Sequence, residues 1–194
     1  MARRRIRSQT EVAARCAELA AEVRRAAERI GDADGDPEIV DAVWRGEALG
    51  TLLWALGRVE LPPYDQPFDT ATAATTSAAG GSLRPDEELA TELATARLWH
   101  WRARTSVLQA SGAVELPPGY ATFDQLIAAT AMRGHERGLL PVPTRGDFQA
   151  YGRVYRQLTP AQRDEAHSIA VERQHALEWL FRPGVSWEDV PLDT

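Results

Sequence analysis

Apolar residues recur every three or four positions over most of the chain, and no stretch of useful length alternates strictly between apolar and polar residues. The first spacing places apolar side chains on one face of an α-helix, whereas alternation is typical of a strand. The pattern predicts an all-α fold, a single compact bundle of about six helices with a docked C-terminal tail. The predicted helices cover residues 8–30, 36–57, 85–111, 122–133, 146–158 and 159–181.

Capping residues mark several of these helix starts. A serine or threonine followed three residues later by glutamate or glutamine can satisfy two free amides of the first turn. Proline suits the first helical position because no amide proton is needed there. These signals occur at Ser8–Glu11, Asp36–Pro37, Thr122–Gln125 and Thr159–Gln162.

The predicted helix over 36–57 carries apolar side chains on nearly every side, so it belongs in the interior of the domain. One charge is out of place, because Glu47 shares a helical seam with Trp44 and Trp54. A buried carboxylate must be paired, protonated or reactive. The last predicted helix has a matching anomaly in Arg173, which lies within the apolar stripe and keeps its charge.

The simplest joint solution is a buried ion pair between Glu47 and Arg173. Arg97 and Arg15 are alternative partners for the glutamate. Such a pair can be a structural link that specifies how two helices pack. Perturbed charges also mark binding sites, so a ligand pocket around the pair is the other interpretation.

Three segments lie outside the predicted helices. Residues 1–7 are rich in arginine and predict a disordered basic N-terminus, followed by one helical domain over 8–194. Residues 70–82 are rich in Ala, Thr, Ser and Gly without periodicity, which predicts a flexible surface loop. The tail after residue 184 is too apolar to extend into water, and we expect Trp187 and Val190 to dock on the bundle.

Composition narrows the class of protein. The 194 residues suffice for one domain with a core, and the net charge of −6 argues against nucleic acid or an anionic membrane as partner. No apolar run reaches the roughly 20 residues of a membrane span, and there is no signal-peptide core. We therefore expect a cytoplasmic bacterial protein. Its only cysteine, Cys16, lies on an apolar helix face and predicts a buried, inert thiol.

Candidate catalytic or metal-binding groups are few. Glu172 and His175 have the spacing of helical di-iron sites, and Asp164 with His167 repeats it, but one helix carries all four residues. We predict no metal and no cofactor. The chain has no phosphate-binding glycine loop and no nucleophile motif. His100, between two tryptophans, is either a base in a pocket or a hydrogen-bonded core residue.

A family pattern is carried by Trp44–Glu47 with Leu53–Gly57, by Ser168–Arg173 with Ala176–Leu180, and by the closing segment Trp187–Thr194. In order and spacing these stretches resemble the bacterial domain-of-unknown-function family numbered four-two-seven-two, over essentially 8–194. The resemblance implies a helical cytosolic domain with Glu47, Arg173 and Asp189 in a linked polar and aromatic core. It implies no activity. Phe181-Arg182 stands where members commonly have Cys-Gly.

Two classes of function stay open. One is a non-enzymatic interaction or accessory protein, of the immunity type, that binds a protein partner or self-associates through an acidic, tryptophan-bearing surface. The other is a small-molecule-binding or enzymatic domain whose pocket is lined by Trp44, Glu47, His100 and Arg173. The candidate residues of this polar core or pocket are Trp44, Glu47, Trp54, Arg97, His100, Trp101, Arg173, Trp187 and Asp189.

Overall fold

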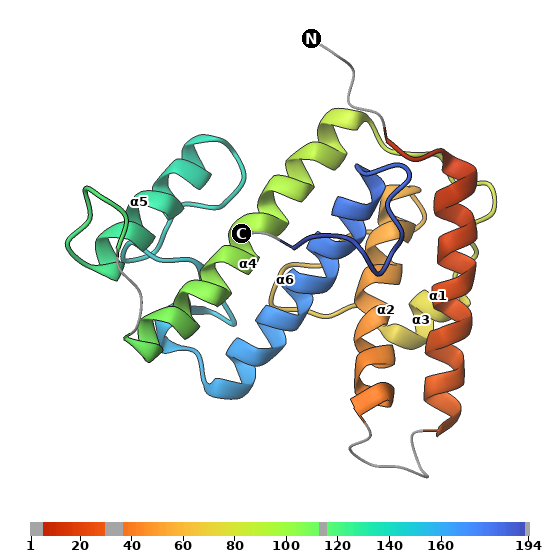
Figure 1. Cartoon of the computed structure of the whole chain (residues 1–194), viewed down its shortest axis with the longest axis horizontal. Helices are drawn as coiled ribbons and strands as arrows, with labels where there is room; N and C mark the ends of the chain where they lie inside the picture. The colour runs from red at the N-terminus through yellow and green to blue at the C-terminus, as the bar shows by residue number, and fades with distance from the viewer. Residues whose placement is uncertain (1–5, 30–36, 113–115, 193–194) are drawn as a thin grey trace.

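The computed structural model describes residues 6–29, 37–112 and 116–192 (Figure 1). The predicted helix end at Ile30 and the N-cap at Asp36 lie outside these ranges. Six α-helices form within them, which confirms the predicted all-α bundle. The elements are α1 (Gln9–Arg29), α2 (Pro37–Ala55), α3 (Thr70–Thr75), α4 (Asp86–Ser111), α5 (Phe123–Glu136), β1 (Gln149–Ala150), β2 (Arg153–Val154), the 3-10 turn η1 (Tyr155–Gln157) and α6 (Pro160–Leu180).

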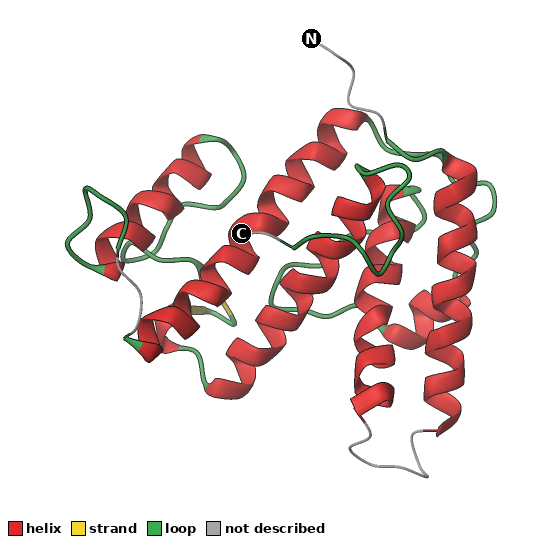
Figure 2. Ribbon diagram, in the orientation of Figure 1, coloured by secondary structure: helices red, strands yellow, loops and turns green. Residues whose placement is uncertain are grey.

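Helix α6 runs between two neighbours, packing against α4 on one side and α2 on the other (Figure 1). Helix α1 covers the far side of α2, and the short α3 lies against both α1 and α2. Helix α5 packs against α4, at the edge of the bundle distant from α1 (Figure 2). Since α2 and α6 each have helices on two sides, polar side chains on them become buried. Near the start of α2, Val40 is 46% exposed.

Two of the three predicted capping boxes form in full, at Ser8–Glu11 and Thr159–Gln162. Thr122 caps α5 by accepting a hydrogen bond from the amide of Gln125. The Gln125 side chain, however, accepts from the amide of Ala121 rather than from that of Thr122. The sequence therefore predicts the start of α5 correctly, but one of the two hydrogen bonds of the predicted capping box has a different donor.

The predicted helix over 146–158 is wrong. This segment forms the antiparallel hairpin of β1 and β2, followed by η1. The connecting residues Tyr151 and Gly152 have φ values of 52° and 67°, in the left-handed region that a tight hairpin turn requires and a helix excludes. The carboxylate of Asp147 also accepts hydrogen bonds from two backbone amides of the segment. Local bonds of this kind compete with a helix for the backbone.

The predicted loop over 70–82 is wrong in its first half, where Thr70–Thr75 forms α3. Asp69 caps the helix by accepting from the amide of Ala71 at 3.1 Å. Ala73 and Ala74 are buried, at 2% and 5% exposure. Small side chains let this short helix lie close to α1 and α2, so a segment of low complexity still contributes to the core.

The predicted disordered segment 1–7 is wrong at its last residue; the first five residues lie outside the described part of the chain. Arg7 is only 8% exposed. Its guanidinium donates to the backbone carbonyls of Trp179 and Arg182, at 2.9 and 3.0 Å, and to that of Val185. Carbonyls at a helix C-terminus lack partners within the helix, so Arg7 completes the end of α6.

The C-terminal tail folds back over the bundle, as predicted. Trp187 and Val190 are each 8% exposed and belong to the core. The Trp187 indole packs edge-on against Trp179 of α6, with ring centroids 5.5 Å apart. Within the described ranges, no helix combines the length and apolar character that crossing a membrane requires.

Candidate functional site

The predicted ion pair joins α2 to α6. Arg173 Nε donates to Glu47 Oε1 at 2.6 Å. The two side chains are 0% and 2% exposed, so both charges lie fully within the interior. The pairing prediction is confirmed. A buried pair of this kind is tolerated only when its remaining polar atoms are also hydrogen bonded.

The remaining hydrogen bonds of the pair go to one connecting segment, residues 62–68. Glu47 Oε2 accepts from the amide of Phe68 at 2.8 Å. The two terminal nitrogens of Arg173 donate at 2.6, 3.3 and 3.2 Å to the carbonyls of Pro62, Pro63 and Gln66. Every polar side-chain atom of the pair is thereby engaged. The pair fixes this segment between α2 and α6 and has no polar atom left over for a ligand.

Aromatic rings and a glycine complete the packing around this pair. The rings of Tyr64 and Phe68 lie 4.5 and 5.6 Å from the guanidinium carbon of Arg173, within cation–π range. Phe68 also lies directly over Gly50 of α2. A Cβ atom at Gly50 would fall 2.3 Å from Cδ2 of this ring. Position 50 therefore needs glycine for close approach.

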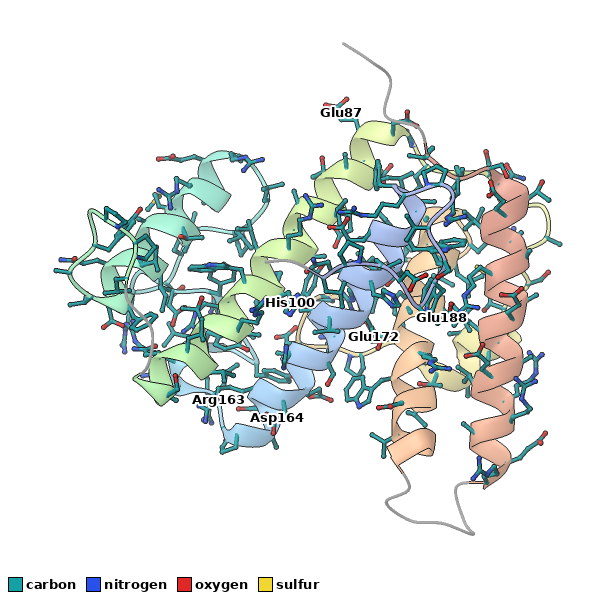
Figure 3. All side chains as sticks on the ribbon, in the orientation of Figure 1. Glu87, His100, Arg163, Asp164, Glu172 and Glu188 are labelled. Carbon is teal, nitrogen blue, oxygen red and sulfur yellow. The ribbon has the colours of Figure 1, made fainter. Side chains whose placement is uncertain are left out.

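His100 has its partners on α6 (Figure 3). Its Nδ1 lies 2.8 Å from Oε1 of Gln174, and its ring centroid is 5.6 Å from that of His167. Burial lowers the pKa of His100, and the hydrogen bond to Gln174 opposes that shift. A neutral imidazole in a core hydrogen bond is therefore the state that this environment favours. Glu47 and His100 thus engage different residues of α6.

The two alternative partners of Glu47 are engaged elsewhere. Arg97 Nε donates to Glu178 Oε1 of α6 at 2.7 Å. Arg15 of α1 donates to Glu18 at 2.9 Å, and its guanidinium carbon lies 4.3 Å from the centre of the Trp187 ring. Both alternatives are wrong.

The other predicted residues are dispersed over the fold. Trp54 is buried with Arg84 above it, the guanidinium carbon 5.0 Å from the ring centre. Trp44 is partly buried at the edge of the core. Asp189 is exposed, and its Oδ2 accepts from the Ser186 hydroxyl at 2.6 Å. These residues support separate packing contacts.

A second buried ion pair was missed in the sequence. Arg102 of α4 donates through Nε and Nη2 to Oδ1 and Oδ2 of Asp147, at 2.7 and 3.0 Å. The side chains are 1% and 0% exposed. The sequence feature that could have predicted it is the position of Arg102 on the same helix face as Trp99 and Ala103, which are both buried. This second pair holds the β1–β2 hairpin segment against α4.

Trp101 and Arg97 line an open groove between α4 and α5 that holds about 450 Å³. We call it the α4–α5 groove. Its apolar lining comes from both helices and the loop after α5. The lining residues are Ala94, Arg97, Leu98, Trp101, Leu126, Thr130, Arg133, Arg137 and Leu139.

Metal and thiol chemistry have little support in the described part of the chain. No group of three or more His, Cys, Asp or Glu side chains converges there in a way that could hold a metal ion. The Cys16 side chain is 2% exposed, and burial raises the pKa of its thiol to about 12. The prediction of a buried thiol is confirmed, and the raised pKa disfavours the thiolate, which is the reactive form.

Comparison of the chain with family models, with curated proteins and with solved structures finds no match. The resemblance to the four-two-seven-two family therefore stays a prediction, and functional inference depends on the geometry of this chain.

Proposed function

We propose that the chain is a non-enzymatic accessory protein of the bacterial cytoplasm that binds a partner protein through the α4–α5 groove. The partner segment is an amphipathic helix bearing acidic side chains. The observation that carries this proposal is the composition of the groove, whose lining combines apolar side chains with three arginines and a partly exposed tryptophan. Grooves of this kind take helices by their apolar face.

Three leucines supply most of the apolar surface of the groove. Leu98, Leu126 and Leu139 come from α4, α5 and the loop that follows α5. Trp101 is partly exposed beside them. Tryptophan and arginine are enriched among residues that dominate binding energy at protein interfaces. The groove thus combines the residue types expected of an interface centre.

The positive charge of the groove favours acidic partner segments over basic ones. Arg133 and Arg137 line the groove together with Arg97, which is paired with Glu178, and the described lining itself contains no carboxylate. The chain as a whole has a net charge of −6, so this positive groove stands against an acidic background. A complementary acidic partner is favoured here and an arginine-rich one is disfavoured. This differs from the acidic interaction surface expected from composition.

The second candidate function, a small-molecule or catalytic pocket around Trp44, Glu47, His100 and Arg173, has weaker support. The polar atoms of Glu47 and Arg173 are engaged by each other and by the 62–68 segment. His100 is bonded to Gln174. A ligand there would have to displace these bonds.

The test is selection of random 20-residue peptides displayed on phage against the full chain, followed by affinity measurement for one enriched peptide. We expect enriched peptides with Asp or Glu around large apolar residues at helical spacing. Trp101→Ala and Arg133→Glu should each weaken binding about tenfold or more, with affinity falling as salt rises.

The matched control is Arg153→Glu, which makes the same charge change at an exposed position of β2. It should leave the affinity within about twofold, since it lies outside the groove lining. Equal weakening by Arg133→Glu and Arg153→Glu, or enrichment of basic peptides, would overturn the proposal.

A further inference from the structure

A second cavity, of about 340 Å³, lies between α1, α2, α6 and the C-terminal tail. We call it the tail cleft. Each of the four elements contributes two residues, and most of them are charged. The lining residues are Arg15, Glu22, Asp41, Arg45, Glu172, His175, Trp187 and Glu188. Figure 3 shows Glu172 of α6 and Glu188 of the tail near one another beside α2.

The arginines of the tail cleft are already paired. Arg45 Nη1 donates to Glu22 Oε2 at 2.6 Å. Arg15 Nη1 donates to Glu18 at 2.9 Å and lies 4.0 Å from the other oxygen of Glu22. The guanidinium of Arg15 also lies over the Trp187 ring. These contacts neutralise most of the positive charge of the lining.

The remaining carboxylates have no such partners. Asp41, Glu172 and Glu188 form no ion pair and no side-chain hydrogen bond with any residue in the described ranges. His175 adds an acceptor, because its Nε2 bonds the Trp187 carbonyl at 2.8 Å and burial lowers its pKa. The neutral ring then donates through Nε2 and leaves the Nδ1 lone pair available. The unused groups of the cleft are therefore acceptors, most of them acidic.

Glu172 is the most constrained of these carboxylates. Burial raises the pKa of its carboxyl to about 7; Arg45 opposes this shift, whereas Asp41 and Glu47 add to it. Arg45 offsets the effect of burial only in part, so the charged form of this carboxyl stays destabilised. A positively charged ligand would stabilise the ionised carboxylate of Glu172.

We propose that the tail cleft binds a small organic polycation, a molecule with at least two ammonium or guanidinium groups separated by a short apolar chain. One cationic group lies beside Glu172, and the other lies near Asp41 or Glu188. The described acidic groups do not converge on one point, so a compact metal ion fits them poorly. An extended cation reaches several separated carboxylates, and a cavity of this volume is within the range of small-molecule sites.

The probe is spermidine, titrated into the full chain by isothermal titration calorimetry at pH 8 and fixed low salt. We expect saturable binding with one molecule per chain. Glu172→Gln should weaken it about tenfold or more, because it removes a charge-assisted contact. Binding to the native chain should weaken below pH 7. At pH 7 it should release protons, seen as heats that depend on the ionisation enthalpy of the buffer.

The matched control is Glu87→Gln, which removes the same charge from an exposed site in the first turn of α4, distant from the cleft (Figure 3). It should change the affinity less than twofold and keep the proton release. Thermal unfolding monitored by circular dichroism confirms that both variants fold. Equal weakening by the two variants, no saturable binding, or preference for citrate over spermidine would each overturn the proposal.

Discussion

Arg102 and Asp147 lie 45 residues apart in sequence and meet in a two-bond ion pair that is almost fully buried. Asp147 also bonds the amides of Phe148 and Arg156, so its carboxylate organises the hairpin segment on which it lies. In the described part of the chain, two ion pairs are buried on both sides, Arg102–Asp147 and Glu47–Arg173. Each anchors a connecting segment of little regular structure to one or two long helices.

Replacing Arg102 by Met should destabilise the fold by about 3–5 kcal/mol, because it leaves the Asp147 charge buried and uncompensated. Urea unfolding measures this cost. Arg97→Met is the matched control, since Arg97 is 41% exposed and Arg182 continues to pair with Glu178. We expect it to cost less than about 1 kcal/mol. Similar losses of unfolding free energy in the two variants would show that the buried Arg102–Asp147 pair stabilises the fold no more than the partly exposed Arg97–Glu178 pair.

Glu47→Gln and Arg173→Met should each cost about 3 kcal/mol, because each strands a buried partner and loosens the 62–68 segment. The double variant should cost clearly less than the sum of the two single variants, since the second change removes a charge that the first had stranded. A double-mutant cycle by chemical denaturation measures this coupling. Additive costs would contradict a direct pair.

Gly50→Ala should destabilise the fold by about 1–3 kcal/mol, because the new methyl group overlaps the Phe68 ring. Helix propensity alone predicts the opposite sign, a gain of about 1 kcal/mol. The contact can be isolated in a Phe68→Ala background, where Gly50→Ala should be neutral or stabilising. Thermal unfolding of the four proteins distinguishes the two effects.

Glu172 should make stability fall as pH rises between about 4.5 and 7. Its pKa is raised to about 7 in the folded chain from 4.5, so the folded state binds more protons than the unfolded state across this interval. Glu172→Gln should therefore be more stable than the native chain at pH 8, by about 1 kcal/mol. The advantage should vanish near pH 4.5. A constant difference at all pH values would exclude Glu172 as the titrating group.

The sequence predicted those features that depend on periodicity and local chemistry. The long helices follow from apolar spacing, and Glu47 and Arg173 were recognisable because each interrupts an apolar face. Their separation of 126 residues did not hide the pair, since two opposite buried charges need one another. Arg102 was harder to recognise, because its stripe also contains polar residues, and its partner lies in a segment that resembles a short helix.

The wrong predictions concern segments whose structure depends on single hydrogen bonds and on packing rather than on apolar spacing. The 146–158 segment has helical composition, but its hydrogen bonds are decided by Asp147 and by a turn at Tyr151 and Gly152. Thr70–Thr75 is too short for periodicity to be visible, and it becomes helical through a cap at Asp69 and packing of two alanines. The tail cleft draws residues from four elements, so no single stretch of sequence could reveal it.

The bonds from Arg7 to carbonyls beyond residue 178 have a consequence for synthesis of the chain. Helix α6 follows every other helix of the bundle in the chain; it carries Arg173, and α6 with the residues just after it supplies the carbonyls that Arg7 bonds. While the ribosome is still making the first five helices, Glu47 lacks the Arg173 cation and Arg7 lacks its carbonyl partners, with only Glu11 of α1 in reach of its guanidinium. Closure of the native interior therefore waits for α6 to emerge, and folding of the nascent chain is completed late rather than helix by helix.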